Sequence, residues 1–366
     1  NEAALASLLD SSAGDASLDH PCTGDGSVLL QSSGTTGVSK IVRRDLAALT
    51  AVGQNCAAAV NMQPTDQLLI TTALSHSYMV DHALMAAMLA GSSVHVSRQF
   101  DPLQLASLAR ETGSTILPTV PFIADMLSQT QAFNAQDLAT IRAAYTAGTP
   151  LPASVAKAFH DKFNIRLGQI YGSTEFGSVT YNDPAAANYD ATLAGLPMQN
   201  VKVCIVDRDK PDIHRPLPAG VEGHVAIAAT SMFSKYLGDH DSSLLDGYFL
   251  SGDLGLLDSQ GRLRLTGRLK LLVDIAGQKV NLIELESLLG QYPSVRDVIV
   301  VPVEVTATVS RLKAIVSWKD APGDLEAMRS WARPRLASYK LPRYFETRQD
   351  LPRSPTGKIL RQQVRP

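Results

Sequence analysis

The sequence has few cysteines, few aromatic residues and no long apolar run. Its three cysteines, Cys22, Cys56 and Cys204, lie far apart and form no CxxC pair. This pattern argues against a disulfide framework or a zinc site and fits a reducing cytosol. No run approaches the roughly 18 apolar residues of a membrane-spanning helix. The polar first residues also lack the basic start and apolar stretch of a signal peptide. We therefore expect a cytoplasmic protein without a membrane span.

A large excess of charge is missing as well, because the formal net charge is −2 over 366 residues. The molecule as a whole therefore gives no reason to expect a nucleic-acid partner. The charge is unevenly spread: residues 270–366 carry 16 Lys and Arg against 10 Asp and Glu, whereas residues 1–269 carry 17 against 25. An acidic body and a basic C-terminal part suggest two units, the second facing anions. An accident of surface composition would explain the same numbers.

Apolar runs alternate with helical patterns through the first half of the chain. Runs such as SVLLQ (27–31) and DQLLITT (66–72) are followed by segments such as DPLQLASLARETG (101–113), in which apolar residues recur every three or four positions. This alternation predicts βα units and a mostly parallel sheet. From about residue 192, short strands separated by Gly, Pro and Asp turns predict an antiparallel section. We therefore predict an α/β body over residues 1–269, with mostly parallel sheet layers and a β-rich section over about 192–269.

The last hundred or so residues predict a small α+β lid domain over 270–366. Its boundary falls near GRLK (267–270). Asn281 is placed as the N-cap of a helix, with Glu284 three residues later. Further elements are predicted as strands at 295–303 and 312–318 and as a helix at 323–336, interrupted by Pro334.

The stretch SSGTTGVSK (32–40) has the composition of a phosphate-binding loop but not the spacing of a Walker A motif. Glycines let the backbone turn its N–H groups toward an anion, hydroxyl groups donate hydrogen bonds or approach Mg²⁺, and the lysine supplies a positive charge. A flexible Gly/Ser turn is the plainer interpretation of such a loop on its own. The candidate phosphate-binding residues are Ser33, Gly34, Thr35, Thr36, Gly37 and Lys40.

Further motifs follow this loop in a fixed order. They are AGTPLP (147–152), YGSTE (171–175), SGDLG (251–255), GRLK (267–270), GQKVNLIELE (277–286) and LPRSPTGKILR (351–361). With the loop, they resemble the adenylate-forming superfamily of acyl- and aryl-CoA synthetases, amino-acid adenylation domains and luciferases. The resemblance implies that ATP and Mg²⁺ activate a carboxylic acid to an acyl-adenylate. A thiol, from CoA or from the phosphopantetheine of an acyl carrier protein, then displaces AMP.

The resemblance also implies roles for residues of the body. Gly148 and Thr149 would border adenine and Tyr171 would stack on it, although a core aromatic is the plainer interpretation of Tyr171 alone. Gly172 and Ser173 belong to the same nucleotide-binding segment. Thr174 would bind the α-phosphate, and Glu175, with Thr35, would hold Mg²⁺. Asp253 would accept hydrogen bonds from the ribose hydroxyls, because two carboxylate oxygens suit a vicinal diol, and Arg268 would support the same ribose.

In the lid, the resemblance implies that Lys358 bridges the α-phosphate and the attacking carboxylate. A solubilising basic tail is the alternative interpretation. Lys270 would be the hinge about which the lid rotates, bringing Gly277 to the thiol path. His76 would gate the carboxylate and thiol path. Amino-acid-activating relatives carry an Asp in this segment, but the count from Gly91 puts Tyr78 at its place. This favours an acid without an α-amino group.

The chain departs from the family in two respects, and the smaller one is that Ala228 and Ala229 stand where the family has an Arg-Gly pair. In complete members the phosphate loop lies much deeper in the chain, so most of the usual N-terminal subdomain is missing or trimmed here. Two functions stay open: an active acid–thiol ligase for an aromatic, fatty or short acyl acid, and a non-catalytic nucleotide-binding relative that regulates or scaffolds. The sequence decides neither the acid, nor CoA against carrier protein, nor the oligomeric state.

Overall fold

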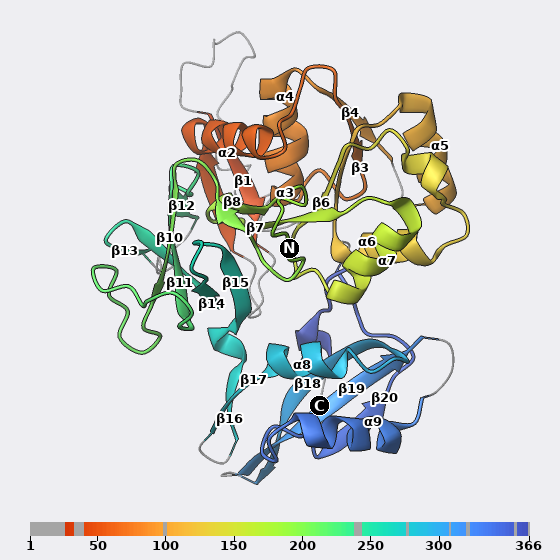
Figure 1. Ribbon diagram of the computed structural model, residues 1–366. Coiled ribbons are helices and arrows are strands. Elements are labelled where there is room, and N and C mark those ends of the chain that lie inside the picture. The colour runs from red at the N-terminus through yellow and green to blue at the C-terminus, as the bar shows by residue number, and fades with distance from the viewer. Residues whose placement is uncertain are drawn as a thin grey trace, which may run out of the picture.

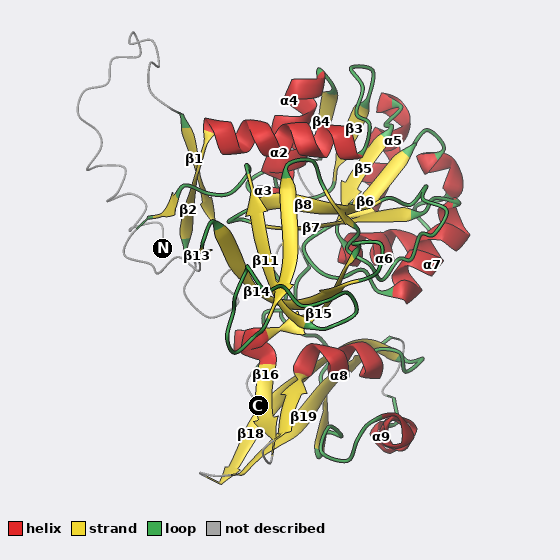
Figure 2. Ribbon diagram, turned by 60° about the vertical axis from the view of Figure 1, so that its left-hand side comes forward, coloured by secondary structure: helices red, strands yellow, loops and turns green. Residues whose placement is uncertain are grey.

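The computed structural model describes residues 26–32, 40–97, 101–237, 244–275, 278–306, 309–319, 323–354 and 357–364. Within these residues a large body lies above a smaller C-terminal unit, here called the lid (Figure 1). The two join through the short 3₁₀ helix η3 (Leu269–Leu271). A second view shows the lid as a layer of its own below the body (Figure 2). The predicted class, an α/β body with a small α+β lid, is confirmed.

The central sheet of the body has the strand order β4-β3-β5-β6-β7-β8-β9. Strands β3 to β7 pair in parallel, as the alternating pattern predicts, whereas β8 and β9 pair antiparallel. The strands are β3 (Gln67–Ile70), β4 (Ser93–Val96), β5 (Ile116–Thr119), β6 (Ala143–Thr146), β7 (Leu167–Ser173), β8 (Gly177–Asn182) and β9 (Leu196–Pro197).

Helices cover both faces of this sheet. Side chains alternate across a strand, so Leu68 and Ile70 of β3 pack with the helices of one face, and Leu69 packs with those of the other. The first face carries α2 (Leu46–Ala59), α3 (Ser77–Met79), the π-helix η1 (Val80–Ala86) and α4 (Ala87–Ala90). The second carries α5 (Pro102–Thr112), α6 (Pro121–Gln129), η2 (Ala135–Leu138) and α7 (Ala153–Phe163).

Local signals start and stop these helices. At α5, the Asp101 side chain accepts a hydrogen bond from the Leu103 N–H, and Pro102 takes the first helical position. Gly113, with a φ of 59°, ends the helix in the left-handed conformation that glycine adopts without strain. The sequence therefore fixes both ends of this helix locally.

Two antiparallel sheets complete the body. The run SVLLQ, which the sequence groups with the parallel units, is instead β1 (Ser27–Gln31), an edge strand paired with β2 (Ile41–Asp45), which also pairs with β12 (Lys235–Tyr236). Only nine residues separate β1 from β2, too few for a parallel crossover. The second sheet has the order β10-β11-β14-β13, with β15 against β14. Its strands are β10 (Val201–Val206), β11 (Gly223–Ala229), β13 (Leu244–Leu245), β14 (Tyr248–Leu257) and β15 (Leu263–Arg268).

The lid packs two helices on a three-stranded sheet around its own apolar core. Asn281 caps α8 as the sequence predicts, because its Oδ1 accepts hydrogen bonds from the N–H groups of Ile283 and Glu284. The sequence missed β20, which pairs in parallel with β19. The lid elements are β16 (Leu272–Ile275), β17 (Gln278–Asn281), α8 (Leu282–Leu289), β18 (Val295–Thr306), β19 (Val309–Trp318), α9 (Leu325–Ala332), η4 (Arg333–Arg335), β20 (Tyr344–Thr347) and η5 (Arg361–Gln363).

Candidate active site

Asp253 and Arg268 form an ion pair at the edge of the body nearest the lid. They lie opposite each other on the neighbouring strands β14 and β15. Arg268 Nε donates to Asp253 Oδ1 at 2.6 Å, and Tyr171 Oη donates to Asp253 Oδ2 at 2.8 Å. The structure thus brings together three predicted nucleotide-binding residues from motifs that are far apart in the sequence.

Tyr171 is largely buried, and its ring centroid lies 5.6 Å from that of Phe176. Burial, with the Asp253 carboxylate beside it, raises the pKa of the phenol far above its usual value. The phenol therefore stays protonated and donates its hydrogen bond to Asp253. Stacking of this ring on adenine stays a prediction.

The irregular part of β14 just before Asp253 is held by His224, which sequence reasoning missed, and by Ser251, the first residue of the SGDLG motif, for which no role of its own was predicted. Ser251 Oγ accepts a hydrogen bond from the Asp253 N–H at 3.0 Å. His224 Nε2 accepts one from the Gly252 N–H at 2.8 Å, where Gly252 has a φ of 75°. The sequence did carry a signal for His224, since it is the one titratable residue in the apolar strand GHVAIAA. Both contacts hold the backbone that carries the Asp253 side chain.

Glu175 is tied to the base of the phosphate loop. Tyr236 Oη donates to Glu175 Oε1 at 3.2 Å, and the ammonium nitrogen of Lys40 lies 4.4 Å from the centroid of the same tyrosine ring. Ser32 and Lys40 close the loop at its base, because the Ser32 N–H donates to the Lys40 carbonyl at 2.8 Å and the Lys40 N–H to Ser32 Oγ at 3.1 Å. Lys40 and Glu175 therefore share one corner of the body.

Thr174 lies beside the segment that follows β3. Its Oγ1 is 3.3 Å from Ser77 Oγ, and Ser77 is the neighbour of His76. Burial, and then the charge of Lys358, lower the pKa of His76, so its imidazole is neutral at pH 7. The predicted α-phosphate ligand and the predicted gate thus lie close together.

Lys358 reaches this cluster from the lid. Burial and the positive charges of Arg268 and Arg361 lower its pKa to about 8, against the opposing effect of Asp253. Lys358 also lowers the pKa of His76, so its ammonium group lies within electrostatic range of both the Asp253–Arg268 pair and His76. The lid residue predicted to be catalytic and the body residues predicted to bind the nucleotide therefore meet in one place.

Other predicted residues lie at the margin of this cluster. Gly148, with a φ of 88°, and Thr149 are exposed just after β6, and Lys270 is exposed in η3. Gly172 needs to be glycine, because a Cβ there would lie 2.5 Å from the Gly177 carbonyl oxygen, and Ser173 Oγ accepts a hydrogen bond from the Glu175 N–H. The remaining candidates lie outside the described residues: Ser33, Gly34, Thr35, Thr36, Gly37 and Gly277.

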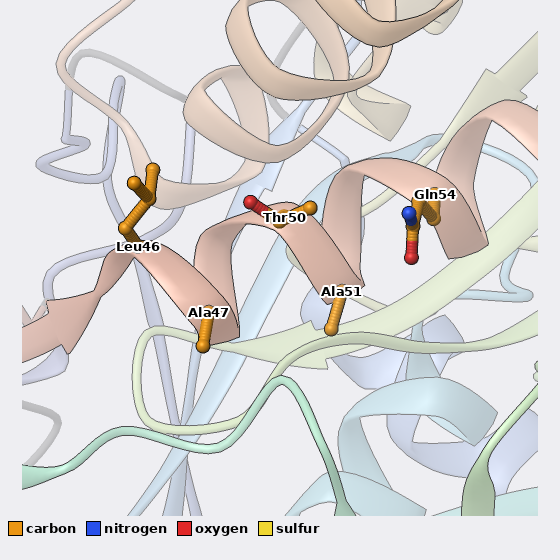
Figure 3. A pocket seen from close by; sticks show the side chains of 5 residues that line it. All are labelled: Leu46, Ala47, Thr50, Ala51 and Gln54. Carbon is orange, nitrogen blue, oxygen red and sulfur yellow. The ribbon is translucent and has the colours of Figure 1, made fainter.

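A separate depression lies on the surface of α2 and contains none of the predicted site residues (Figure 3). Its lining residues all come from one helix and none is charged: Leu46, Ala47, Thr50, Ala51 and Gln54. A binding site normally combines an apolar wall with polar groups that converge from several elements. This depression lacks that convergence, so it is no competitor for the cluster around Asp253.

Two further absences concern the described part of the chain alone. There, no group of three or more His, Cys, Asp or Glu side chains is arranged to hold a metal ion. No helix in these ranges is both long and apolar enough to cross a membrane.

Comparison with known protein families assigns the class. A family model for AMP-binding enzymes matches residues 4–237, and the model for the AMP-binding enzyme C-terminal domain matches residues 284–358. The chain therefore belongs to the AMP-binding, adenylate-forming enzyme family, as its motifs indicate.

Among the curated relatives are proteins named as ligases of CoA or of an acyl carrier protein. The chain is 28% identical to 4-coumarate–CoA ligase 5 of Oryza sativa subsp. japonica, over 93% of this chain and 65% of that protein. It is 30% identical to the fatty acid–[acyl-carrier-protein] ligase ScoC of Streptomyces coeruleorubidus, over 75% of this chain and 54% of that protein. The chain thus spans less than two thirds of the length of these relatives.

Solved structures share the fold. ATP-bound MatB from Rhodopseudomonas palustris superimposes with a TM-score of 0.85 at 24% identity, over 97% of this chain and 71% of that chain. O-succinylbenzoate coenzyme A synthetase (MenE) from Bacillus subtilis, in complex with ATP and magnesium ion, gives 0.79 at 23% identity, over 92% and 69%.

Proposed function

We propose that this protein is an acid–thiol ligase that uses ATP to convert a carboxylic acid to an acyl-adenylate and then transfers the acyl group to a thiol. The carboxylate oxygen attacks the α-phosphorus, and the bond to pyrophosphate breaks. The thiol then attacks the acyl carbon, and AMP leaves. The observation that carries the proposal is that Lys358, a lid residue, comes within electrostatic range of the Asp253–Arg268 pair of the body.

The residues of the cluster fit ATP. From the described residues, each oxygen of the Asp253 carboxylate accepts one hydrogen bond, and a carboxylate has about four acceptor positions. Acceptor capacity for a ribose diol therefore remains on a side chain whose direction is already fixed. Lys40 and Glu175 both contact Tyr236, so the two charged side chains lie near each other. In this proposal both bind the phosphate end of the same nucleotide.

The chemistry needs little from a general base, because a carboxylic acid is ionised at pH 7. The obstacle is repulsion between this carboxylate and the triphosphate, so catalysis depends on positioned positive charge. Lys358 supplies a charge at the cluster, and Arg268 supports it from the body. His76 is neutral, so it adds no further charge to those of Lys358 and Arg268. In this proposal it borders the path of the acid.

Glu175 fits a magnesium site shared with the substrate. Mg²⁺ is commonly bound by one or two carboxylates together with substrate phosphates, and not by a cage of protein ligands. A single glutamate beside Lys40 agrees with this arrangement, as does the lack of a three-residue metal cluster in the described ranges. When bound, the ion would neutralise part of the phosphate charge.

The acid lacks an α-amino group in this proposal. Asp81, the acidic residue in the segment where amino-acid-activating relatives pair with the substrate ammonium, is buried and bound to Arg44 at 2.6 Å. Tyr78 is engaged with the Tyr145 carbonyl. The Asp81 carboxylate is thus already paired, and Tyr78 has no carboxylate with which to bind a substrate ammonium group. This supports an aromatic or aliphatic acid. The net positive lid suits an anionic acceptor, either CoA or a carrier protein.

The test is ATP–pyrophosphate exchange with 4-coumarate, benzoate, octanoate and malonate, each with Mg²⁺. We expect exchange with at least one of these acids, and thioester formation when CoA or a phosphopantetheinylated carrier protein is added. The Lys358→Ala variant, which should still bind ATP, is the matched control. Absence of acid-dependent exchange by the full protein with all four acids would count against the ligase and for a non-catalytic nucleotide-binding role.

A further inference from the structure

In the lid, residues 353–354 and 357–359 pair with each other around the segment that carries Lys358, here called the hairpin. Arg353 and Ile359 form an antiparallel bridge, the Ser354 N–H donates to the Lys358 carbonyl at 2.8 Å, and the Gly357 N–H donates to the Ser354 carbonyl at 2.8 Å. Arg353 also donates to the Gly357 carbonyl and to Asp297 of β18. These contacts attach the hairpin, and Lys358 with it, to the rest of the lid.

This hairpin touches the body at Phe122 of α6. A Cβ placed on Gly357 would lie 2.5 Å from three atoms of Phe122, its Cβ, Cγ and Cδ1. The guanidinium carbon of Arg353 lies 4.7 Å from the centroid of the same ring. Gly357 is the residue directly before Lys358, so the contact is one residue from the ammonium group that the chemistry needs. In both ribbon views α6 lies on the side of the body that faces the lid (Figures 1 and 2).

Phe122 has no evident part in the core of its own helix. The buried residues of α6 are Pro121, Ile123, Ala124 and Leu127, whereas Phe122 is 38% exposed even with the lid in contact. A large aromatic ring on the outer side of a helix costs solubility and gains the body little. Its partners are lid residues, and an arginine over an aromatic face is an attractive contact in its own right.

We propose that Phe122 is the positioning residue against which the lid docks for the adenylation step, holding the Lys358 hairpin at the nucleotide. The inference rests on the proposed ligase function. Gly357 allows the close approach because it lacks a side chain and has a φ of 77°. Arg353 covers the ring from the hairpin side. Phe122 does not contact the reacting atoms; it acts through the placement of Lys358.

A role in docking predicts unequal effects on the two half-reactions. Lys358 must be at the nucleotide for adenylation, whereas the transfer of the acyl group from a preformed adenylate to the thiol does not use this hairpin. A displacement of about 1 Å can cost about 100-fold in rate. We therefore expect Phe122→Ala to lower kcat for ATP–pyrophosphate exchange by about 10- to 100-fold, with KM for ATP changed by less than about threefold.

The kinetic experiment compares four proteins: wild type, Phe122→Ala, Phe122→Tyr and Leu103→Ala. Exchange is measured with an acid that the wild type accepts, and transfer to the thiol is measured from the synthetic adenylate of that acid. Phe122→Tyr keeps the ring and should restore exchange. Leu103→Ala removes an exposed apolar side chain from α5 and should leave both steps unchanged. Equal losses in both half-reactions for Phe122→Ala, or no loss, would overturn the proposal.

A second measurement needs no substrate and separates docking from the ligase function. A photo-crosslinking residue, p-benzoylphenylalanine, is placed at position 122 and, as the control, at position 103. After irradiation, mass spectrometry should find position 122 joined to the lid peptide that contains Arg353 and Lys358, and position 103 joined to none of the lid. Crosslinks from position 122 to the body alone would refute the docking. A crosslink to the lid in a protein without exchange activity would refute the ligase function instead.

Discussion

Two arginine–aspartate pairs in the body have the same length and opposite surroundings. Arg44 Nη1 lies 2.6 Å from Asp81 Oδ1, and Arg268 Nε lies 2.6 Å from Asp253 Oδ1. The side chains of the first pair are 0% and 2% exposed, and those of the second are 35% and 8% exposed. Distance alone therefore does not separate an ion pair that is sealed in the core from one that is open to a ligand. Access to solvent does.

The buried pair of Arg44 and Asp81, here called the sealed pair, holds elements of the site together without facing it. Asp81 Oδ2 accepts hydrogen bonds from Ser178 N at 3.0 Å and from Ser178 Oγ at 3.1 Å. Arg44 lies on β2, directly after the phosphate loop, Asp81 follows the His76 segment, and Ser178 follows the turn with Glu175. The sealed pair thus fixes three motif-bearing segments relative to one another. The more exposed pair of Arg268 and Asp253, here called the open pair, keeps acceptor positions for a substrate.

The largest expected effect breaks the sealed pair. Asp81→Asn removes the negative charge and leaves the Arg44 guanidinium buried, and Arg44 Nε and Nη2 already lack hydrogen-bond partners in the described structure. Breaking a buried ion pair in this way costs about 3–5 kcal/mol. Urea denaturation followed by circular dichroism measures the loss.

The matched control removes both charges. A double variant, Arg44→Met with Asp81→Leu, should recover most of the lost free energy of unfolding, because no unpaired charge remains buried. If Asp81→Asn alone costs less than about 1 kcal/mol, the contrast between a sealed and an open pair does not hold.

The next effect concerns the open pair and its lid partner. Lys358→Ala removes the charge that faces Asp253 and Arg268. We expect exchange to fall by about 100- to 1,000-fold, the size of a lost electrostatic contact to the transition state, with little change in stability. Isothermal titration should show that ATP still binds. Pyrophosphate exchange at a near-normal rate in this variant would remove Lys358 from the mechanism.

A smaller effect is expected at Asp253 itself. Asp253→Asn keeps the shape of the side chain and an acceptor for Tyr171. It removes the negative charge that pairs with Arg268 and that would accept hydrogen bonds from the ribose diol. A hydrogen bond to a charged group contributes about 1.5–3 kcal/mol, so KM for ATP should rise by about 10- to 100-fold. Unlike Asp81→Asn, the variant should stay close to wild type in urea. A large loss of stability with an unchanged KM would show that this pair is structural too.

The sequence singles out Asp253 and Arg268, each as a ribose-binding residue, and misses the pairing of Arg44 with Asp81, for a physical reason. Asp253 and Arg268 sit in short motifs whose neighbours are Gly and Ser, and those motifs keep their order along the chain. Arg44 and Asp81 carry no such signature, because their pairing depends on how β2 packs against η1, a contact between residues 37 positions apart. Local pattern reveals a site motif, whereas a buried pair emerges only from tertiary packing.

The fold shows the same division. Alternating apolar runs predict the parallel strands β3 to β7, and the cap at Asn281 predicts α8. The pattern fails for β1, which has the apolar composition of a parallel strand but pairs antiparallel with β2. It also fails for Phe122, since an outward-facing aromatic on α6 acquires its lid contact only when two distant segments meet.

The smallest expected effect depends on the protonation state of Lys358, the lid residue near the open pair. Lys358 lies within electrostatic range of Arg268, Arg361, Asp253 and His76, and its pKa in the free protein is about 8. A lysine with a lowered pKa loses its ammonium proton as pH rises through that value, so kcat/KM for ATP in the exchange assay should fall about twofold at pH 8 and about tenfold at pH 9.

His76 does not produce this fall in kcat/KM at alkaline pH, because its own pKa is shifted down and away from this range. In Lys358→Arg the guanidinium stays charged, so the weaker residual activity should be flat from pH 7 to pH 9. An alkaline limb that persists in this variant would mean that another group titrates and that the charge on Lys358 is not what the open pair needs.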